Sequence, residues 1–344
     1  MLILVDAMGG DHAPEAFVNG CIDAVNESEG FEVMLIGDAK RVESLINARQ
    51  FNSPRLKVAH ASEVITSDDI PTKAIRRKKD SSMVVGFNLL KGQKGDIFIS
   101  AGNTGALMTG ALFILGRIKG VERPALAPML PSRSGQVMLI DGGMNAECKP
   151  VNFLQFGIMG SIYMKEVFNI EEPRVGLINI GTEENKGTEV IRHAYTLLSQ
   201  SSINFAGNIE GREILDGHID VAVCDGFLGN VLLKFTEGVG PFIFDTLKEV
   251  YAKNFISKLS ALLVKKDLRE FKRRFDYREH GGARILGVEG KVVKIHGSSD
   301  ARAVRNAVLR AESFGKSPII ERIREEFKDN MVEDIDTQVP SDPD

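Results

Sequence analysis

Residues 97–106 read IFISAGNTGA, and this stretch decides the fold. A short apolar run ends in a glycine-containing turn, and an apolar segment rich in small residues follows at 104–115. A buried strand that passes through such a turn into a helix is the repeating unit of α/β proteins. Backbone N–H groups exposed at the turn attract anions, so the sequence predicts a phosphate-binding loop. Alternatively, Gly102 and Gly105 serve only close packing of the helix on the sheet.

The same alternation of short apolar runs and longer amphipathic segments extends over most of the chain. It predicts an α/β fold with a mostly parallel sheet in an α/β/α sandwich. The expected strands are residues 2–5, 33–36, 56–58, 97–100, 125–130, 137–140, 175–179, 203–205, 221–223, 284–286 and 292–295. The expected helices are residues 15–25, 40–48, 83–90, 104–115, 153–167, 189–198, 231–251 and 301–327.

No internal repeat and no Pro/Ser-rich linker divides the chain, so residues 1–328 are expected to form one intertwined unit with a helical hairpin at about 254–276. The last stretch, 329–344, is acidic, contains two prolines and lacks an apolar face. Such a composition predicts a disordered tail.

The composition excludes several classes of protein. With 344 residues, 43% of them hydrophobic, the chain is long enough to bury a large core. Its net charge of −4 gives no sign of nucleic-acid binding. Three cysteines without CxxC spacing suit a reducing cytosol, and no apolar run reaches the length of a membrane span. We therefore expect a cytoplasmic protein that is soluble or peripherally membrane-associated.

A second candidate loop, VDAMGGDHAP at 5–14, follows the first expected strand. In open α/β sheets, ligands bind beyond the carboxyl ends of the strands. Two glycines permit close backbone approach and three polar side chains can face a ligand: Gly9, Gly10, Asp6, Asp11 and His12. The alternative is a tight turn in which Asp11 or His12 caps the next helix.

Three further loops carry polar groups after expected strands. GTEENKG (181–187) contains Lys186, which either neutralises a phosphate or is an ordinary exposed lysine. CDGFLGN (224–230) contains Asn230, which either donates to a developing oxyanion or caps a helix. HGSSDARA (296–303) contains His296 and Ser298, and its serines either cap the last helix or bind an oxygen-rich ligand.

Several familiar motifs are missing. There is no GxGxxG, HExxH or GxSxG, so dinucleotide binding, zinc proteolysis and nucleophile-elbow hydrolysis have no support. GKS at 315–317 ends like a P-loop, but Arg310 stands where the first glycine is required and a helix precedes it. Cys148 and Cys224 are expected to be structural. We expect no cofactor and no metal.

Two basic segments stand out. AIRRKK (74–79) is either a dock for an acidic carrier or a solvated helix end. Residues 258–274 hold seven Lys or Arg against two acidic residues, interleaved with leucines and a phenylalanine. Such an amphipathic face can lie in a bilayer interface and attract anionic lipid. The alternative is a dimer-interface or core helix whose charges lie in water.

These loops together resemble one family. DAMGGDHAP, RRKKDSSM, SAGNTGALM, GRIKGVERPALAP, IGTEENKG, CDGFLGNVLLK, GGARILGV and HGSSD occur in order from the first strand to about residue 328 and are similar to the PlsX family of fatty acid/phospholipid synthesis proteins. The resemblance implies an isocitrate/isopropylmalate dehydrogenase-like fold and a homodimer that associates with the membrane through the hairpin. One departure is visible, because the loop DGGMN (141–145) has Met144 where a small residue is usual.

The resemblance further implies transfer of a fatty acyl group from acyl carrier protein to inorganic phosphate, giving an acyl phosphate for a membrane glycerol-3-phosphate acyltransferase. On this hypothesis Lys186 and Asn230 are catalytic, with Asn230 at the oxyanion. The substrate-binding candidates are Asp6, Gly9, Gly10, Asp11, His12, Ser100, Gly102, Asn103, Thr104, His296 and Ser298. Competing hypotheses are a phosphate acetyl- or butyryltransferase using coenzyme A, an NAD-dependent decarboxylating dehydrogenase, and a non-catalytic membrane adaptor.

Overall fold

The computed structural model describes residues 1–279 and 281–329. Apart from Asp329, the predicted acidic tail lies outside the described residues. The described chain alternates strands and helices, which confirms the predicted α/β class.

Strands from the amino-terminal part of the chain, together with two from its carboxyl-terminal part, build a sheet of seven strands. Its order is β3-β2-β1-β4-β12-β11-β5, and only β11 runs antiparallel to its neighbours. The strands are β1 (Leu2–Asp6), β2 (Glu32–Gly37), β3 (Leu56–His60), β4 (Ile97–Ser100), β5 (Ala125–Ala127), β11 (Ala283–Leu286) and β12 (Val292–Lys294).

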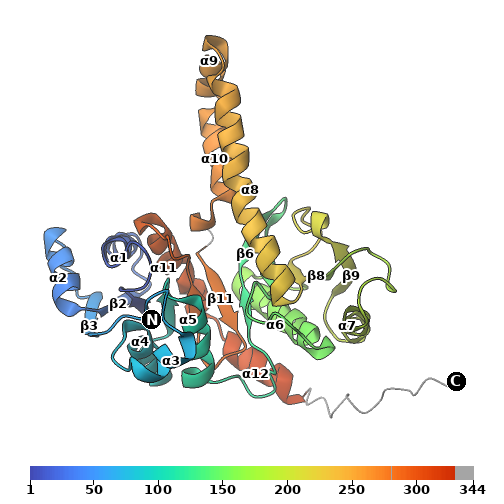
Figure 1. Ribbon diagram of the computed structural model, residues 1–344, viewed down its shortest axis with the longest axis horizontal. Coiled ribbons are helices and arrows are strands. Elements are labelled where there is room, and N and C mark those ends of the chain that lie inside the picture. Colours follow the sequence, from blue (N-terminus) through green and yellow to red (C-terminus); the bar gives the residue numbers. More distant parts are fainter. Residues whose placement is uncertain (280, 330–344) are drawn as a thin grey trace.

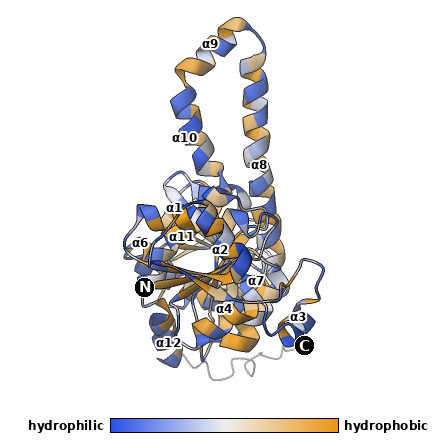
Figure 2. Cartoon of the chain, turned by 90° about the vertical axis from the view of Figure 1, so that its left-hand side faces the viewer, coloured by the Kyte–Doolittle hydropathy of each residue, from blue (hydrophilic) through white to orange (hydrophobic). Residues whose placement is uncertain are grey.

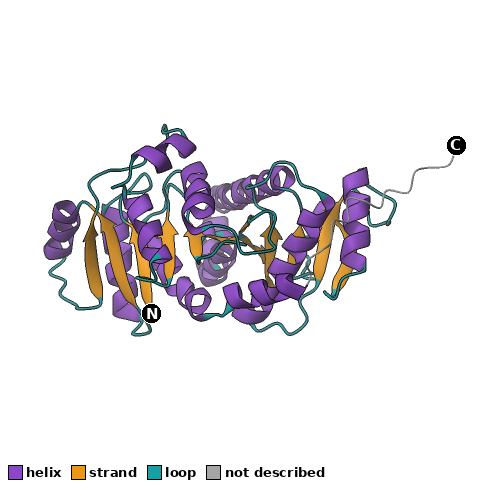
Figure 3. Cartoon of the chain, turned by 90° about the horizontal axis from the view of Figure 1, so that it is seen from below, coloured by secondary structure: helices purple, strands orange, loops and turns teal. Residues whose placement is uncertain are grey.

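A second sheet of five strands has the order β6-β7-β10-β8-β9, and only β6 is antiparallel. Its strands are β6 (Met129–Ser132), β7 (Gly135–Ile140), β8 (Val175–Asn179), β9 (Phe205–Glu210) and β10 (Val221–Val223). The chain enters this sheet after β5 and returns to the first sheet at β11. Figure 3 shows the two sheets along the length of the molecule, with helices on both sides.

Helices cover both sheets because each carries an apolar face. In α1 (Glu15–Glu27) the buried residues include Phe17, Val18, Cys21, Ile22 and Val25, a spacing that makes one helical face. The other covering helices are α2 (Ala39–Ala48), α3 (Pro71–Arg77), α4 (Ser82–Lys91), α5 (Thr104–Gly110), α6 (Pro150–Phe168), α7 (Glu189–Ser199), α11 (Ala301–Lys316) and α12 (Ile319–Asp329). Figure 1 shows their places around the sheets.

One buried cluster joins the two sheets. It contains Ile3 and Val5 of β1 together with Met138 and Ile140 of β7 and Val175 of β8. All five side chains are fully buried. The two sheets therefore share a core, as expected of strands that cross from one sheet to the other.

A helical arm projects from the body (Figures 1 and 2). It consists of α8 (Gly226–Ala252), α9 (Phe255–Leu263) and α10 (Lys265–Phe275). The Asp225 carboxylate caps α8 by accepting a hydrogen bond from the Leu228 backbone N–H at 2.8 Å. The hairpin predicted at 254–276 is therefore only the tip and the returning limb. The outgoing limb is the distal half of α8, which the sequence predicted as a separate helix.

Prolines explain two further differences between prediction and structure. The strand expected at 125–130 is divided at Pro128 into β5 and β6, which belong to different sheets. The helix expected at 301–327 is divided beside Pro318 into α11 and α12. Proline lacks the backbone N–H that either ladder would need and restricts the residue before it. The short helix α3 was not predicted, and the strand expected at 203–205 lies at 205–210.

Candidate functional site

The predicted loops meet at the carboxyl ends of neighbouring strands. In the first sheet, β1, β4 and β12 are adjacent and lead into loops 7–12, 101–103 and 295–300. In the second sheet, β7, β10 and β8 are adjacent and lead into loop 141–149, the start of α8 and loop 180–188. This is the edge at which open α/β folds bind ligands.

A buried hydrogen bond joins the first two loops. The Ser100 hydroxyl donates to Asp6 Oδ2 at 2.7 Å and accepts from the Gly102 backbone N–H at 3.0 Å. Both side chains are buried, and burial raises the pKa of Asp6. A Cβ on Gly9 would lie 2.7 Å from the Gly102 nitrogen, so only glycine allows this approach. Asp6 and Ser100, predicted to bind substrate, are buried and hold loops 7–12 and 101–103 together.

Two other predicted members of these loops also make hydrogen bonds within the protein. The Asp11 backbone N–H donates to the Gly297 carbonyl at 2.8 Å, next to Gly10 with its positive φ of 101°. Asn103 caps α5 through Ala106 and donates to the carbonyls of residues 66, 67 and 69. Its amide is therefore committed to the protein rather than to a ligand.

On the opposite side, the DGGMN loop is organised by one carboxylate. Asp141 is buried and accepts hydrogen bonds from the backbone N–H groups of Leu126, Met144 and Asn145 at 2.6–3.0 Å. The Met144 side chain packs against the apolar cluster under the first sheet. Met144 thus takes part in the loop through its backbone N–H, and its partly buried side chain packs against this cluster.

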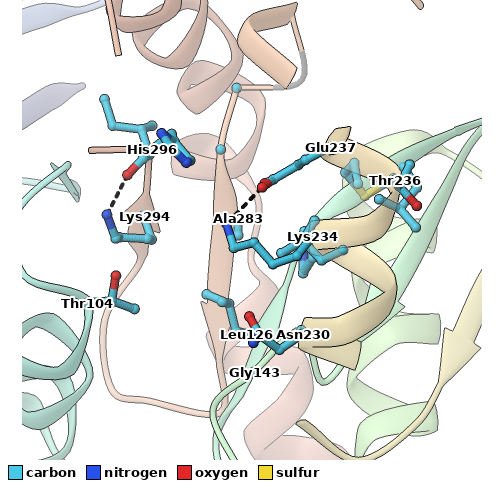
Figure 4. Close-up of a pocket in the computed structure, with 18 of the residues that line it drawn as sticks. Thr104, Leu126, Gly143, Asn230, Lys234, Thr236, Glu237, Ala283, Lys294 and His296 are labelled. Carbon is cyan, nitrogen blue, oxygen red and sulfur yellow. Dashed lines mark hydrogen bonds and ion pairs between the residues drawn. The ribbon is translucent and has the colours of Figure 1, made fainter. Parts of the chain in front are cut away.

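A cleft of about 270 Å³ lies between the two sheets at the foot of α8 (Figure 4). Each sheet contributes one side, and α8 and the end of α10 contribute the part nearest the arm. The polar residues that line it are Thr104, Asn230, Lys234, Thr236, Glu237, Arg278, Lys294, His296 and Ser299. Three residues predicted for the site, Thr104, Asn230 and His296, are among them.

Asn230 lies on α8 one turn after its start and faces Gly143, as Figure 4 shows. A Cβ on Gly143 would be 3.1 Å from the Asn230 Cβ, and Gly143 has a positive φ of 130°. The Gly226 backbone N–H donates to the Asn145 carbonyl at 2.7 Å, which fixes the start of α8 against the DGGMN loop. The exposed Asn230 amide is thereby held over the cleft.

The sequence did not predict Lys294 as a site residue. Its Nζ atom donates to the carbonyls of Ile295 at 2.6 Å and Ala101 at 3.3 Å, and the side chain is half-buried. Burial lowers the pKa of Lys294 to about 8. Lysine has three donors, so one N–H remains for a ligand in the cleft. The only sequence signal was a lysine at the end of an apolar strand next to HGSSD.

A second cation, Lys234, stands one turn beyond Asn230 on α8. Its ammonium pairs with the Glu237 carboxylate at 2.7 Å. On the first sheet's side, His296 Nδ1 lies 2.8 Å from the Ser298 hydroxyl, and burial lowers the pKa of this imidazole. The cleft therefore combines two ammonium groups with neutral donors, an arrangement suited to an anion.

The predicted residues other than Thr104, Asn230 and His296 do not line the cleft, and His12 and Lys186 are among them. His12 is exposed and does not cap α1 with its side chain, because the N-cap of that helix is Pro14 and no side-chain cap hydrogen bond is present. Lys186 is exposed in loop 180–188 and does not line the cleft. Its loop nevertheless follows β8, the neighbour of the strand that leads to Asn230. Lys186 thus shares the carboxyl edge of the second sheet with the cleft.

The thiols near the cleft are poor nucleophiles. Burial raises the pKa of Cys148 to about 12 and that of Cys224 well above its ordinary value. Within residues 1–279 and 281–329, no group of three or more His, Cys, Asp or Glu side chains could hold a metal ion. No helix in that same part of the chain is long and apolar enough to cross a membrane.

Comparison with known proteins places the chain in a family. A protein from Acetivibrio thermocellus named phosphate acyltransferase is 58% identical over 98% of this chain and 99% of its own length. Another of that name, from Alkaliphilus oremlandii, is 51% identical over 94% and 97%. A phosphotransacetylase structure from Streptococcus pyogenes shares the fold, with a TM-score of 0.63 at 14% identity over 92% and 94% of the two chains. Residues 1–322 match the family described as fatty acid synthesis protein, and the chain belongs to that family.

Proposed function

We propose that this protein transfers a fatty acyl group from the thioester of acyl carrier protein to inorganic phosphate and releases an acyl phosphate. The relatives named phosphate acyltransferase support the general reaction, acyl transfer to phosphate. The observation that carries the proposal is the cleft itself, where cationic groups lie beside a largely apolar surface.

Phosphate binds near Lys294, which offers an ammonium donor at the carboxyl end of β12. Lys234 supplies a second positive charge once its bond to Glu237 is shared with the ligand, and the neutral His296 and Thr104 supply uncharged hydrogen-bond partners. Phosphate is a weak nucleophile, so holding it in line with the thioester carbonyl supplies much of the rate acceleration.

The thioester carbonyl lies at Asn230, whose amide donates to the oxygen as negative charge develops in the tetrahedral intermediate. The phosphate oxygen forms a bond to the carbonyl carbon, and the carbon–sulfur bond then breaks. A pantetheine thiol resembles cysteine, with a pKa of about 8.5, so it can leave as thiolate without a strong acid. The thioester is already activated, and the transfer proceeds without a cofactor.

Lys186 remains a proposed catalytic residue. Loop 180–188 begins at the carboxyl end of β8. The Lys186 carbonyl accepts a hydrogen bond from Asn179 Nδ2 at 3.1 Å, which fixes the backbone, and the Lys186 side chain is exposed. If the Lys186 side chain extends from the second sheet into the cleft, its ammonium would contact the phosphate on the side opposite Lys294, which belongs to the first sheet.

The acyl donor is tested by incubating the purified protein with phosphate and either palmitoyl-acyl carrier protein or palmitoyl-coenzyme A. Acyl phosphate is trapped with hydroxylamine and identified by mass spectrometry. We expect turnover with the carrier thioester to exceed that with coenzyme A. Preference for coenzyme A would make the protein a phosphotransacylase of the coenzyme A type, and no acyl phosphate from either donor would refute the proposal.

We also propose that the protein is cytoplasmic and binds the membrane peripherally through the arm. Large apolar side chains of α9 are 52–82% exposed, namely Phe255, Ile256, Leu259, Leu262 and Leu263 (Figure 2). Basic residues of α10 stand beside them, a pattern that attracts anionic lipid. Exposed Phe227, Phe235 and Phe242 of α8 supply a surface for a homodimer. At the membrane the acyl phosphate would pass to a glycerol-3-phosphate acyltransferase.

A further inference from the structure

The cleft has a polar end and an apolar side. Lys294, His296 and Thr104 lie on the side of the cleft that the first sheet contributes, opposite α8. Met129, Leu130 and Pro131 of β6 and Leu233 of α8 form a continuous apolar lining. These four side chains contribute no group to the phosphate chemistry described above. They line space that an uncharged, flexible substrate part can fill.

The cleft extends along α8 toward the arm. The α8 residues that face the cleft are Asn230, Leu233, Lys234, Thr236 and Glu237, which follow one another along two helical turns. A helix rises 1.5 Å per residue, so Glu237 lies about 10 Å further along the α8 axis than Asn230. A chain attached to a carbonyl at Asn230 can therefore extend along α8 toward the base of the arm.

Phe275 lines this distal end of the cleft. It is the last residue of α10, and its backbone lies against α8 at Gly240, where a Cβ would be 3.4 Å from both the Phe275 Cβ and carbonyl oxygen. Behind it, the Phe271 ring packs edge-on at 5.2 Å, and Phe244 packs on Phe271 at 5.4 Å. Phe275, Phe271 and Phe244 thus form an aromatic cluster where the two limbs of the arm meet the body, at this end of the cleft.

We propose that the hydrocarbon chain of the substrate lies between β6 and α8, with Phe275 as the residue that limits its length. This inference rests on the proposed acyl transfer and adds its specificity-determining residue. A chain that extends as far as Phe275 lies along the cleft, and each further methylene meets the ring or is directed outward along the arm.

The test uses straight-chain fatty acids from hexanoate to octadecanoate, titrated calorimetrically into the full-length protein. Burial of one methylene raises affinity about fourfold, so affinity should climb with length until the chain meets Phe275 and then level off. We call the chain length at which affinity levels off the break. In Phe275→Ala the break should lie at a chain that is two or more carbons longer. In Phe275→Trp the break should lie at a shorter chain.

Phe271→Ala is the matched control. It removes an aromatic ring from the same helix and loses both ring contacts, but Phe271 does not line the cleft. Its break should stay at the wild-type length. An unmoved break in both Phe275 variants, or an equal shift in Phe271→Ala, would overturn the inference.

Acyl phosphate formation from thioesters of the same lengths separates this inference from the proposed reaction. If acyl phosphate forms but the preferred length is unchanged in the Phe275 variants, the length-limiting role fails alone. If no length gives acyl phosphate, the reaction fails, and the binding series still shows whether the cleft holds a hydrocarbon chain.

Discussion

Ser100 donates a hydrogen bond to Asp6 at 2.7 Å, across 94 positions of the sequence, and neither side chain reaches solvent. The bond joins the ends of β4 and β1 and fixes the loops beneath the cleft. A buried pair of this kind is sensitive to the loss of either partner, because the remaining group has no water to replace it.

Ser100→Ala should therefore lower the free energy of unfolding by about 1–3 kcal/mol, since Asp6 and the Gly102 N–H both lose their hydroxyl partner. Urea denaturation followed by circular dichroism measures the change. The KM for phosphate should rise as well, because the loop beside Lys294 is loosened. Wild-type stability in this variant would show that the bond is dispensable.

Lys294 should make phosphate use dependent on pH. Its pKa is about 8, below the ordinary lysine value, so the ammonium that attracts phosphate is lost as pH rises through about 8. The apparent kcat/KM for phosphate should fall over that range. An arginine keeps its positive charge at these pH values, so in Lys294→Arg the fall in kcat/KM that comes from deprotonation of Lys294 should disappear. Lys294→Met has no charge here and should lower kcat/KM at every pH. A profile that is unchanged in Lys294→Arg contradicts the assignment.

The same group contributes to stability with the opposite trend. Because the pKa is lower in the folded than in the unfolded chain, the unfolded chain binds more protons between about pH 8 and pH 10.5. The Lys294 contribution to the free energy of unfolding thus becomes more favourable as pH rises through that window. Comparing urea denaturation of wild type and Lys294→Met at both ends of the window isolates the contribution.

Lys186→Ala should abolish acyl phosphate formation while leaving the unfolding curve unchanged, since the side chain is exposed. Lys119→Ala, which alters another exposed lysine outside the cleft, should have wild-type turnover. Full activity in Lys186→Ala would remove this residue from the mechanism and leave Lys294 and Lys234 as the cations of the site.

The exposed apolar tip of the arm should control membrane binding. Leu263→Asp, at a side chain that is 82% exposed, should reduce sedimentation with anionic phospholipid vesicles by tenfold or more. Stability and turnover of water-soluble short-chain thioesters should not change. Undiminished vesicle binding in both Leu263→Asp and Phe255→Asp would show that the apolar tip does not bind the membrane.

The loops at the sheet edge were predictable because each combines an apolar run, a glycine turn and a helix start, all of them local signals. Asn230 and His296 were found in this way. Lys294 was not, because its place in the cleft depends on β12 lying beside β4, a neighbour almost 200 positions away. The division into two sheets was also missed, because it too depends on contacts between distant segments. The sequence around Pro128 reads locally as one strand, although β5 and β6 on either side of it belong to different sheets.

The arm is also the second of the two passages between the sheets. The outgoing limb begins at β10 of the five-stranded sheet, and the chain that returns through α10 next enters β11 of the seven-stranded sheet. Tilting the arm, as adsorption of its tip to a bilayer would do, therefore applies torque to both sides of the cleft at once. If the arm binds a membrane as proposed, the distance between the two sides of the cleft, and with it the turnover rate, would depend on the surface to which the protein is bound.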